Sequence, residues 1–258
     1  LRVWFIDPAT RMNPNFNCAS ALPGVYDGMP IGIIFGVQMI NMLDYVNVLT
    51  LSDSWSKKDN DALKKWFDDY TAWLLMSDFG VIESRGTNNH GTWFSAQVAV
   101  YAIYNNRMEL AKEMVEKGKK QIEQQIAMGA KAKYPDGCLP RELDRNQSLN
   151  YSVYGLKAFT TLAQCAKLLD EDLWNYQTDD GKGLRAAFKF LAPYLNGSKE
   201  WTWKNIDNKD KISIGAISII RQAAKAFDTP ELKQAEQYLT KIAPATSDKI
   251  YLMGINRK

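Results

Sequence analysis

The sequence predicts an all-α protein, and three observations lead to that fold class. Apolar residues recur at helical spacing from about residue 30 onward, runs that alternate apolar and polar residues are scarce, and turn residues divide the chain into segments of helical length. The hydrophobic fraction is 46% and the charged fraction is 24%, which is ordinary for a globular domain with a buried core. A chain of 258 residues is long enough for one large domain.

The expected helices pair along the chain into about four hairpins. Pro30 and Pro230 suit first helical turns. Gly80 and Gly129 suit C-terminal caps, and Asn105 opens a tight junction. The expected helical ranges are 30–50, 57–79, 89–106, 107–128, 147–170, 183–195, 210–227 and 230–242.

The spacing of the hairpins predicts a ring. Successive hairpins begin roughly 50–60 residues apart, so we expect a complete or incomplete α/α toroid whose inner helices share one direction. We expect residues 1–258 to form a single toroid domain, and because residues 1–5 resemble the end of a helix, we expect it to lack N-terminal helices. Loops at about 8–29, 130–146 and 196–209 are long enough to predict a functional role.

Charge and cysteine content narrow the classes of partner. A formal net charge of +3 is too weak to predict nucleic-acid binding, but it is compatible with an anionic substrate. One histidine and three cysteines without metal-binding spacing predict no metal and no cofactor, and we expect the thiols to be free and buried. We expect no membrane insertion, and we recognise no leader peptide. The sequence leaves the oligomeric state open.

The first candidate site is the run Asn88-Asn89-His90, which opens a predicted helix and contains the only histidine of the chain. The free backbone N–H groups and the dipole at a helix N-terminus favour an anion by about 0.3–1 kcal/mol. A substrate carboxylate would be stabilised there. The alternative is that an asparagine caps the helix and the histidine is an ordinary surface residue.

The second candidate site runs from Asp136 to Tyr154 and leads from a loop into another predicted helix. Tyr151 and Tyr154 lie three residues apart and share a helix face, with Arg145 close by in sequence. If the helix at 107–128 is an outer one, both helix starts face the same rim and the two sites converge. The alternative is a pair of core tyrosines beside surface ion pairs.

These motifs carry a resemblance to a known family. Residues 4–15, the run Asn88-Asn89-His90 and residues 145–154 resemble the alginate lyase family and related toroid lyases of uronic-acid polymers, in the expected order over roughly residues 1–195. The resemblance implies a substrate cleft on one rim of the ring. It also implies cleavage of an anionic polysaccharide such as alginate by β-elimination, in a periplasmic or secreted enzyme.

The resemblance also implies roles for single residues. Asn89 and His90 would neutralise the uronate carboxylate, and Tyr151 would protonate the leaving glycosidic oxygen. Arg145 would lie near Tyr151, although the family spacing between these two positions is one residue longer, so Arg141 is the alternative. The residues expected to bind substrate are Arg11, Asn13, Asn88 and Tyr154.

The chemistry fits these side chains. Removal of the C5 proton of a uronate builds further charge on an anionic group, and preorganised donors that stabilise such charge typically contribute about 10²–10³ in rate. A tyrosine with a pKa of about 10 is a poor base unless a cation such as Arg145 lies beside it. In guluronate the C5 proton and the C4 oxygen lie on opposite faces, so a second base is needed, and His90 is the only imidazole.

Three tryptophans are further candidates for stacking on sugar rings. Trp93 follows His90 by one helical turn, and Trp201 and Trp203 lie in a predicted loop. Core packing, or anchoring of that loop, is an equally good interpretation.

Two other functions remain open from the sequence. A toroid glycoside hydrolase would need two carboxylates that flank the scissile bond. A non-catalytic uronan-binding protein would bind without forming product. The candidate carboxylates for a hydrolase are Glu83, Asp136, Glu142 and Asp144.

Overall fold

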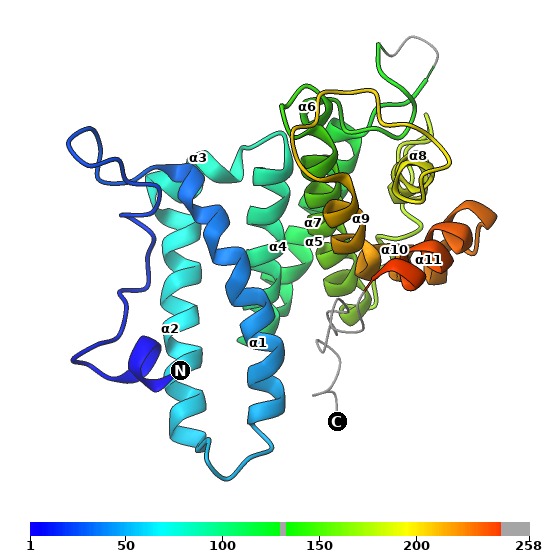
Figure 1. Cartoon of the computed structure of the whole chain (residues 1–258). Coiled ribbons are helices and arrows are strands. Elements are labelled where there is room, and N and C mark those ends of the chain that lie inside the picture. Colours follow the sequence, from blue (N-terminus) through cyan, green and yellow to red (C-terminus); the bar gives the residue numbers. More distant parts are fainter. Residues whose placement is uncertain (130–132, 244–258) are drawn as a thin grey trace.

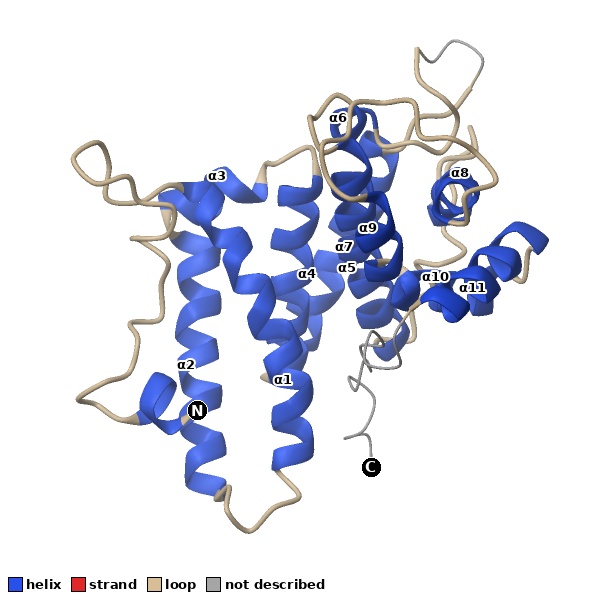
Figure 2. Ribbon diagram, in the orientation of Figure 1, coloured by secondary structure: helices blue, strands red, loops and turns tan. Residues whose placement is uncertain are grey.

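The computed structural model describes residues 1–129 and 133–243, and over these ranges it consists of helices joined by loops and isolated bridges, without a strand (Figures 1 and 2). The helices are the π-helix η1 (Arg2–Ile6), the 3-10 helix η2 (Pro30–Gly36), α1 (Val37–Leu49), α2 (Lys57–Met76), α3 (Asp78–Ser84), α4 (Asn89–Tyr104), α5 (Met108–Gln125), α6 (Pro140–Leu143), α7 (Ser148–Leu168), α8 (Leu184–Leu195), α9 (Lys209–Gly215), α10 (Ile217–Phe227) and α11 (Pro230–Ile242).

The long helices form two layers, which confirms the predicted toroid class. The inner layer consists of α1, α4, α7 and α10, each in contact with the next. In the outer layer, α2 packs on α4, α5 packs on both α4 and α7, and α8 packs on α7 and α10. Because α5 carries the chain back between α4 and α7, these two inner helices begin at the same end of the molecule, near α3 and α6 (Figure 1).

Local sequence signals explain several helix starts. Ser56 and Asp59 form a capping box at the start of α2, with Asp59 N donating to Ser56 Oγ at 3.1 Å and Ser56 N to Asp59 Oδ2 at 3.0 Å. Pro30 and Pro230 lie in the first turns of η2 and α11, as predicted. The junction that begins at Asn105 is also confirmed, since the next residue has a positive φ of 58°.

The predicted helix 57–79 was wrong at its C-terminal end. The structure ends α2 at Met76 and starts the separate helix α3, whose N-cap Ser77 accepts a hydrogen bond from Gly80 N at 3.1 Å. Gly80 therefore lies inside α3 and is not a C-cap. A Cβ at Gly80 would lie 1.8 Å from the carbonyl oxygen of Leu74, so only glycine lets α3 turn so closely against α2.

Other boundaries also differ from the prediction. α5 ends at Gln125 and is capped by extended Ile126, so Gly129 is a loop residue and not a C-cap. The predicted helix 210–227 is divided at Ala216 into α9 and α10. The predicted loop 130–146 contains α6, and its residues 130–132 lie outside the described part.

The cysteines are free, as expected, but not all of them are buried. Cys138 and Cys165 are buried, and burial raises the pKa of the Cys138 thiol to about 12. Cys18 is exposed, so the expectation of burial was wrong there. It lies in the long N-terminal loop between η1 and η2.

The inner helices carry the core. Most residues of α4 and α7 are buried, because each helix has neighbours on several sides. The continuous stretch Pro30–Leu49, made of η2 and α1, is long and apolar enough for a membrane span by length and composition. Such composition is weak evidence for a membrane span, because a core helix of a soluble protein passes the same test, and here the stretch packs on α4.

Candidate active site between the starts of α4 and α7

The start of α4 presents the predicted histidine. Asn88 is the N-cap, and its Oδ1 accepts a hydrogen bond from His90 N at 3.3 Å. The ring of His90 is bonded through Nδ1 to Oε1 of Glu83 at 2.6 Å. Glu83 comes from the last turn of α3 and is only 5% exposed, whereas 21% of the His90 side chain is exposed. Glu83 thus fixes the imidazole through Nδ1, while part of the ring remains exposed to solvent.

Asn89 joins the two predicted sites. Its backbone N and its Nδ2 donate to the same oxygen, Oε1 of Glu142, at 2.7 and 2.9 Å. Glu142 lies on the short helix α6, which packs on α7. A buried carboxylate of the second site therefore holds the helix start that carries the first site.

Asn89 itself is fully buried. Its amide nitrogen has two hydrogens, of which Glu142 accepts one, while Oδ1 has no hydrogen-bond partner. A direct contact between this amide and a substrate carboxylate requires the amide to be uncovered, whereas His90 and Tyr151 are already partly exposed.

Tyr151 and Arg145 lie together at the start of α7. The Cζ atom of Arg145 lies 4.1 Å from the centroid of the Tyr151 ring, a close cation–π contact. Both side chains are partly exposed. The shorter sequence spacing therefore does not prevent Arg145 from reaching Tyr151, and Arg141, which is exposed on α6, is not needed to supply a cation there.

Aromatic residues one turn further along connect α4 with α7. The ring centroids of Trp93 and Tyr154 are 5.1 Å apart. Trp93 is 4% exposed, and burial raises the pKa of Tyr154 to about 12. The two rings line a cavity of about 260 Å³, just below the ~300–1,000 Å³ that is usual for small-molecule sites. Other polar residues of its lining are Gln38, Asn41, Lys157, Thr161 and Ser218.

Electrostatics place Glu142 between the two clusters. Burial raises the pKa of its carboxyl, while the two hydrogen bonds from Asn89 and the charges of Arg145 and His90 oppose that rise. Glu142 is bonded to a member of each cluster, because its Oε1 accepts from Asn89 and its backbone oxygen accepts from Arg145 N at 3.2 Å. The two helix starts lie at the same end of the molecule and are joined through Glu142, while a common cleft for substrate stays a prediction.

Two predicted substrate-binding residues lie elsewhere. Arg11 and Asn13 line a separate recess of about 190 Å³ together with Trp66 of α2. Trp66 Nε1 donates to the carbonyl oxygen of Met12 at 2.9 Å, which ties the loop to α2. Trp66 lies ten residues before Met76, so at 1.5 Å per residue this recess is roughly 15 Å from the rim end of α2. The structure does not bring Arg11 and Asn13 to the starts of α4 and α7.

The loop tryptophans anchor their loop. Trp201 Nε1 donates to Ser148 Oγ at 2.8 Å, and Ser148 Oγ donates to the carbonyl oxygen of Lys204 at 2.7 Å. The centroids of Trp201 and Trp203 are 4.9 Å apart, and both rings contact aromatic residues of α8. Because Ser148 is the first residue of α7, this loop is fastened next to the helix turn that carries Tyr151.

Sequence reasoning missed part of this site. Lys157, Gln38 and Asn41 line the cavity, yet none was a candidate. Lys157 follows Tyr154 by three residues on the same face of α7, so helical spacing could have identified it. No signal in the sequence linked α1 to α4, because the two helices meet only through their neighbouring positions in the inner layer of the ring.

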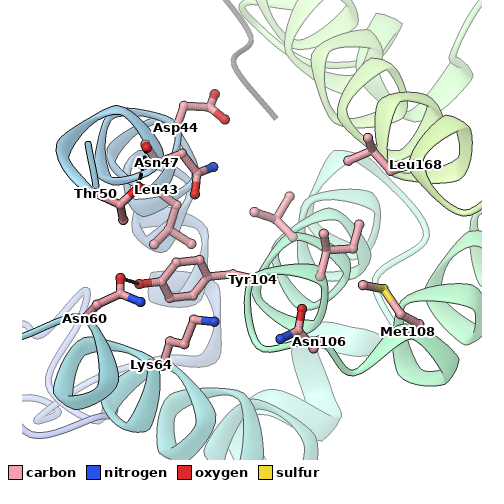
Figure 3. A pocket seen from close by; sticks show the side chains of 12 residues that line it. Leu43, Asp44, Asn47, Thr50, Asn60, Lys64, Tyr104, Asn106, Met108 and Leu168 are labelled. Carbon is pink, nitrogen blue, oxygen red and sulfur yellow. Dashed lines mark hydrogen bonds between the residues drawn. The ribbon is translucent and has the colours of Figure 1, made fainter. Parts of the chain in front are cut away.

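A larger cavity of about 330 Å³ lies at the opposite end of the inner layer (Figure 3). Tyr104, the last residue of α4, extends into it and donates to Asn60 Oδ1 at 3.4 Å. Asn89 and Tyr104 stand fifteen residues apart on α4, which corresponds to roughly 22 Å along the axis. None of the residues that line this cavity belongs to the predicted site.

Comparisons with known proteins agree with the geometry. The sequence model of the family described as alginate lyase matches residues 1–201. An alginate lyase of Cobetia marina is 30% identical over 137 residues, which are 53% of this chain and 34% of that protein. The crystal structure of an alginate lyase from Bacteroides ovatus superimposes with a TM-score of 0.85 at 29% identity, over 98% of this chain and 65% of that one. The chain thus spans about a third of the first relative and less than two thirds of the second.

Proposed function

The chain belongs to the alginate lyase family, as the match over residues 1–201 shows, and from this premise we propose that it is a polysaccharide lyase that cleaves a polyuronate by β-elimination. The observation that carries the proposal is the meeting of His90 and Asn89 at the start of α4 with Tyr151 and Arg145 at the start of α7, around Glu142. The substrate class is an anionic polysaccharide, and alginate is the first candidate.

We propose that the carboxylate of the substrate binds at the start of α4. The helix dipole and the imidazole of His90 would stabilise the charge that develops when the C5 proton leaves, and the second amide hydrogen of Asn89 would join them once substrate binding uncovers that buried amide. Glu142 holds Asn89 at this position through two hydrogen bonds. In this way the site lowers the barrier to forming a carbanion next to an existing carboxylate.

Tyr151 is proposed to transfer the proton. As phenolate it would take the C5 proton, and as phenol it would then donate that proton to the C4 oxygen of the departing sugar, a contribution typically worth about 10²–10⁴ in rate. The guanidinium of Arg145 lies over its ring, with Cζ 4.1 Å from the ring centroid, and so places a positive charge beside the phenol. One residue can serve both steps where the two groups lie on the same face of the sugar, as in mannuronate and glucuronate.

The four carboxylates that were candidates for a glycoside hydrolase are engaged in other contacts. Glu83 and Glu142 are buried and are bonded to His90 and Asn89. Asp136 accepts a hydrogen bond from Gly129 N at 2.8 Å, and Asp144 accepts one from Tyr134 Oη at 2.7 Å. Each of the four candidate carboxylates thus already has a hydrogen-bond partner within the protein, which supports the lyase over a hydrolase.

The test is a panel of defined polymers of mannuronate, guluronate and glucuronate, incubated with the purified chain. A lyase makes a C4=C5 double bond conjugated with the carboxylate, so ultraviolet absorbance should rise with at least one polymer. New reducing ends without such absorbance would indicate a hydrolase, and binding without any product would indicate a uronan-binding protein. The polymer cleaved fastest identifies the preferred uronate. We propose a periplasmic or secreted location, where such polymers occur.

A further inference from the structure

His90 and Glu83 form a close contact, and Glu83 has no role among those that the family resemblance implies. Glu83 Oε1 lies 2.6 Å from His90 Nδ1, and Glu83 is 5% exposed. Glu83 comes from α3, a helix that the sequence did not predict, and it precedes His90 by seven residues. The two side chains are therefore brought together by the fold of the α3–α4 junction and not by one helix face.

Two glycines fix this junction. A Cβ added at Gly86 would lie 2.7 Å from Gly91 N, and a Cβ added at Gly91 would lie 1.9 Å from the carbonyl oxygen of Gly86. The end of α3 and the first turn of α4 thus approach closely enough to exclude any side chain between them. Because the backbone is held on both sides of the pair, Glu83 and His90 meet in one defined geometry.

The hydrogen bond engages Nδ1 of His90 and so leaves Nε2 as the ring nitrogen for any further partner. An ionised carboxylate can only accept, so the nitrogen bonded to Glu83 must carry the proton. Nδ1–H is then fixed, and Nε2 is the nitrogen that can meet a substrate group. In the neutral ring Nε2 is an acceptor, and in the imidazolium it is a donor toward a carboxylate.

We propose that Glu83 is a positioning residue that fixes the Nδ1–H tautomer of His90 and points Nε2 at the substrate. This inference rests on the proposed lyase function, since it assigns the orientation of a group in that site. Glu83 does not touch the substrate and acts only through the imidazole. With Nδ1–H fixed in this way, Nε2 of His90 donates to a substrate carboxylate when the ring is protonated and accepts a proton when the ring is neutral.

The single histidine makes the proposal measurable without any assay of activity. Nitrogen-15 NMR of the histidine-labelled protein yields signals from one ring, and these report its tautomer directly. The wild type should show the Nδ1–H form of the neutral ring. Glu83→Gln keeps the shape of the side chain but can bond either tautomer, so a mixture of the two forms should appear.

The kinetic part of the test uses the polymer that the wild type cleaves best. Glu83→Gln should lower kcat by at least about 10-fold, as the loss of an orienting partner typically does, with a much smaller change in KM. Glu83→Asp keeps the charge and should restore part of both kcat and the Nδ1–H signal. Glu109→Gln, which changes an exposed carboxylate on α5, is the matched control and should leave both readouts unchanged.

Two outcomes would overturn the inference: an Nε2–H ring in the wild type, or unchanged kcat and tautomer in Glu83→Gln. Absence of cleavage by the wild type would instead count against the lyase function. The tautomer measurement would still decide whether Glu83 orients His90, so the two failures can be told apart.

Discussion

At the scale of single residues, Glu142 combines two opposed demands. It must be ionised to accept two hydrogen bonds from Asn89 most strongly, yet it is 1% exposed, and its Oε2 has no hydrogen-bond partner. The effect of burial is larger than that of the hydrogen bonds and the neighbouring charges, so the pKa of Glu142 lies above its ordinary value of 4.5. The folded state therefore binds the proton of Glu142 more tightly than the unfolded state does.

This shift predicts a pH dependence of stability. The contribution of Glu142 is fully present below pH 4.5 and is lost as the pH rises through its raised folded pKa. Glu142→Gln is neutral at every pH and keeps an oxygen to accept from Asn89. The free energy of unfolding of the variant, relative to the wild type, should thus increase as the pH rises from acid to neutral. Urea denaturation across that range measures it, and a constant difference would contradict the prediction.

The candidate residues of the site came from two sequence motifs, and their roles came from the resemblance to a known family. Asn89, His90, Arg145 and Tyr151 were all candidates; in the structure Glu142 bonds to Asn89 and to the backbone N of Arg145, and Arg145 lies over the ring of Tyr151. The role of that carboxylate was not predictable, because a glutamate in a loop beside arginines resembles a surface ion-pair partner. Only the packing of α6 shows that Glu142 is buried against Asn89.

At the scale of elements, the α3–α4 junction decides the position of His90. The prediction extended the preceding helix to residue 79 and left the next segment as a connection, because Gly80 suits a C-terminal cap. In the structure the same serine both ends α2 and caps α3. Helical periodicity cannot show such a break, since the apolar spacing continues across it.

We expect Gly91→Ala to destabilise the protein by about 1–3 kcal/mol, since the new Cβ would meet the backbone oxygen of Gly86 and that strain exceeds the modest gain in helix propensity. Polyuronate cleavage should fall as well, because His90 is the neighbouring residue. Gly215→Ala is the control: its Cβ would lie 3.7 Å from Lys157 Nζ, an ordinary contact, and stability should change by less than about 0.5 kcal/mol. Equal stability of the two variants in urea would refute this account of the junction.

At the scale of the whole molecule, the loop between α8 and α9 ties the C-terminal hairpins to α7. Trp201 bonds to Ser148, and Ile206 N donates to the carbonyl oxygen of Asn146 at 3.1 Å. Leu149 N donates to Asn205 Oδ1 at 3.3 Å. The turn that carries Tyr151 is thus held from a segment more than 50 residues further along the chain.

Removal of this anchor should affect both stability and catalysis. Trp201→Ala deletes a partly buried ring and leaves Ser148 Oγ without its donor, so we expect a loss of about 2–3 kcal/mol and slower cleavage as Tyr151 loses its fixed position. Trp4→Ala is the control: Trp4 lies on η1 and is 61% exposed, so its removal should change stability and the rate of cleavage little. If Trp201→Ala lowered stability but left the rate untouched, the loop would not position the α7 start.

The ring architecture followed from hairpin spacing, but the placement of the N-terminal loop did not. Helix lengths and turn residues were enough to predict alternating inner and outer helices, because short connections force neighbours to be antiparallel. Arg11 and Asn13 were expected at the cleft and lie against Trp66 instead. A long loop can run along either layer, and its route depends on side-chain packing, such as the bond from Trp66 to Met12, that a pattern of residues does not encode.

The central claim is that Tyr151 moves the proton on a uronate held at the start of α4. The most direct test compares the wild type with Tyr151→Phe on the best polyuronate, following unsaturated product by absorbance and binding by calorimetry. Loss of the hydroxyl should lower the rate by about 10²–10⁴ while the dissociation constant stays nearly the same. Cleavage at close to the wild-type rate would remove Tyr151 from the reaction and contradict the account.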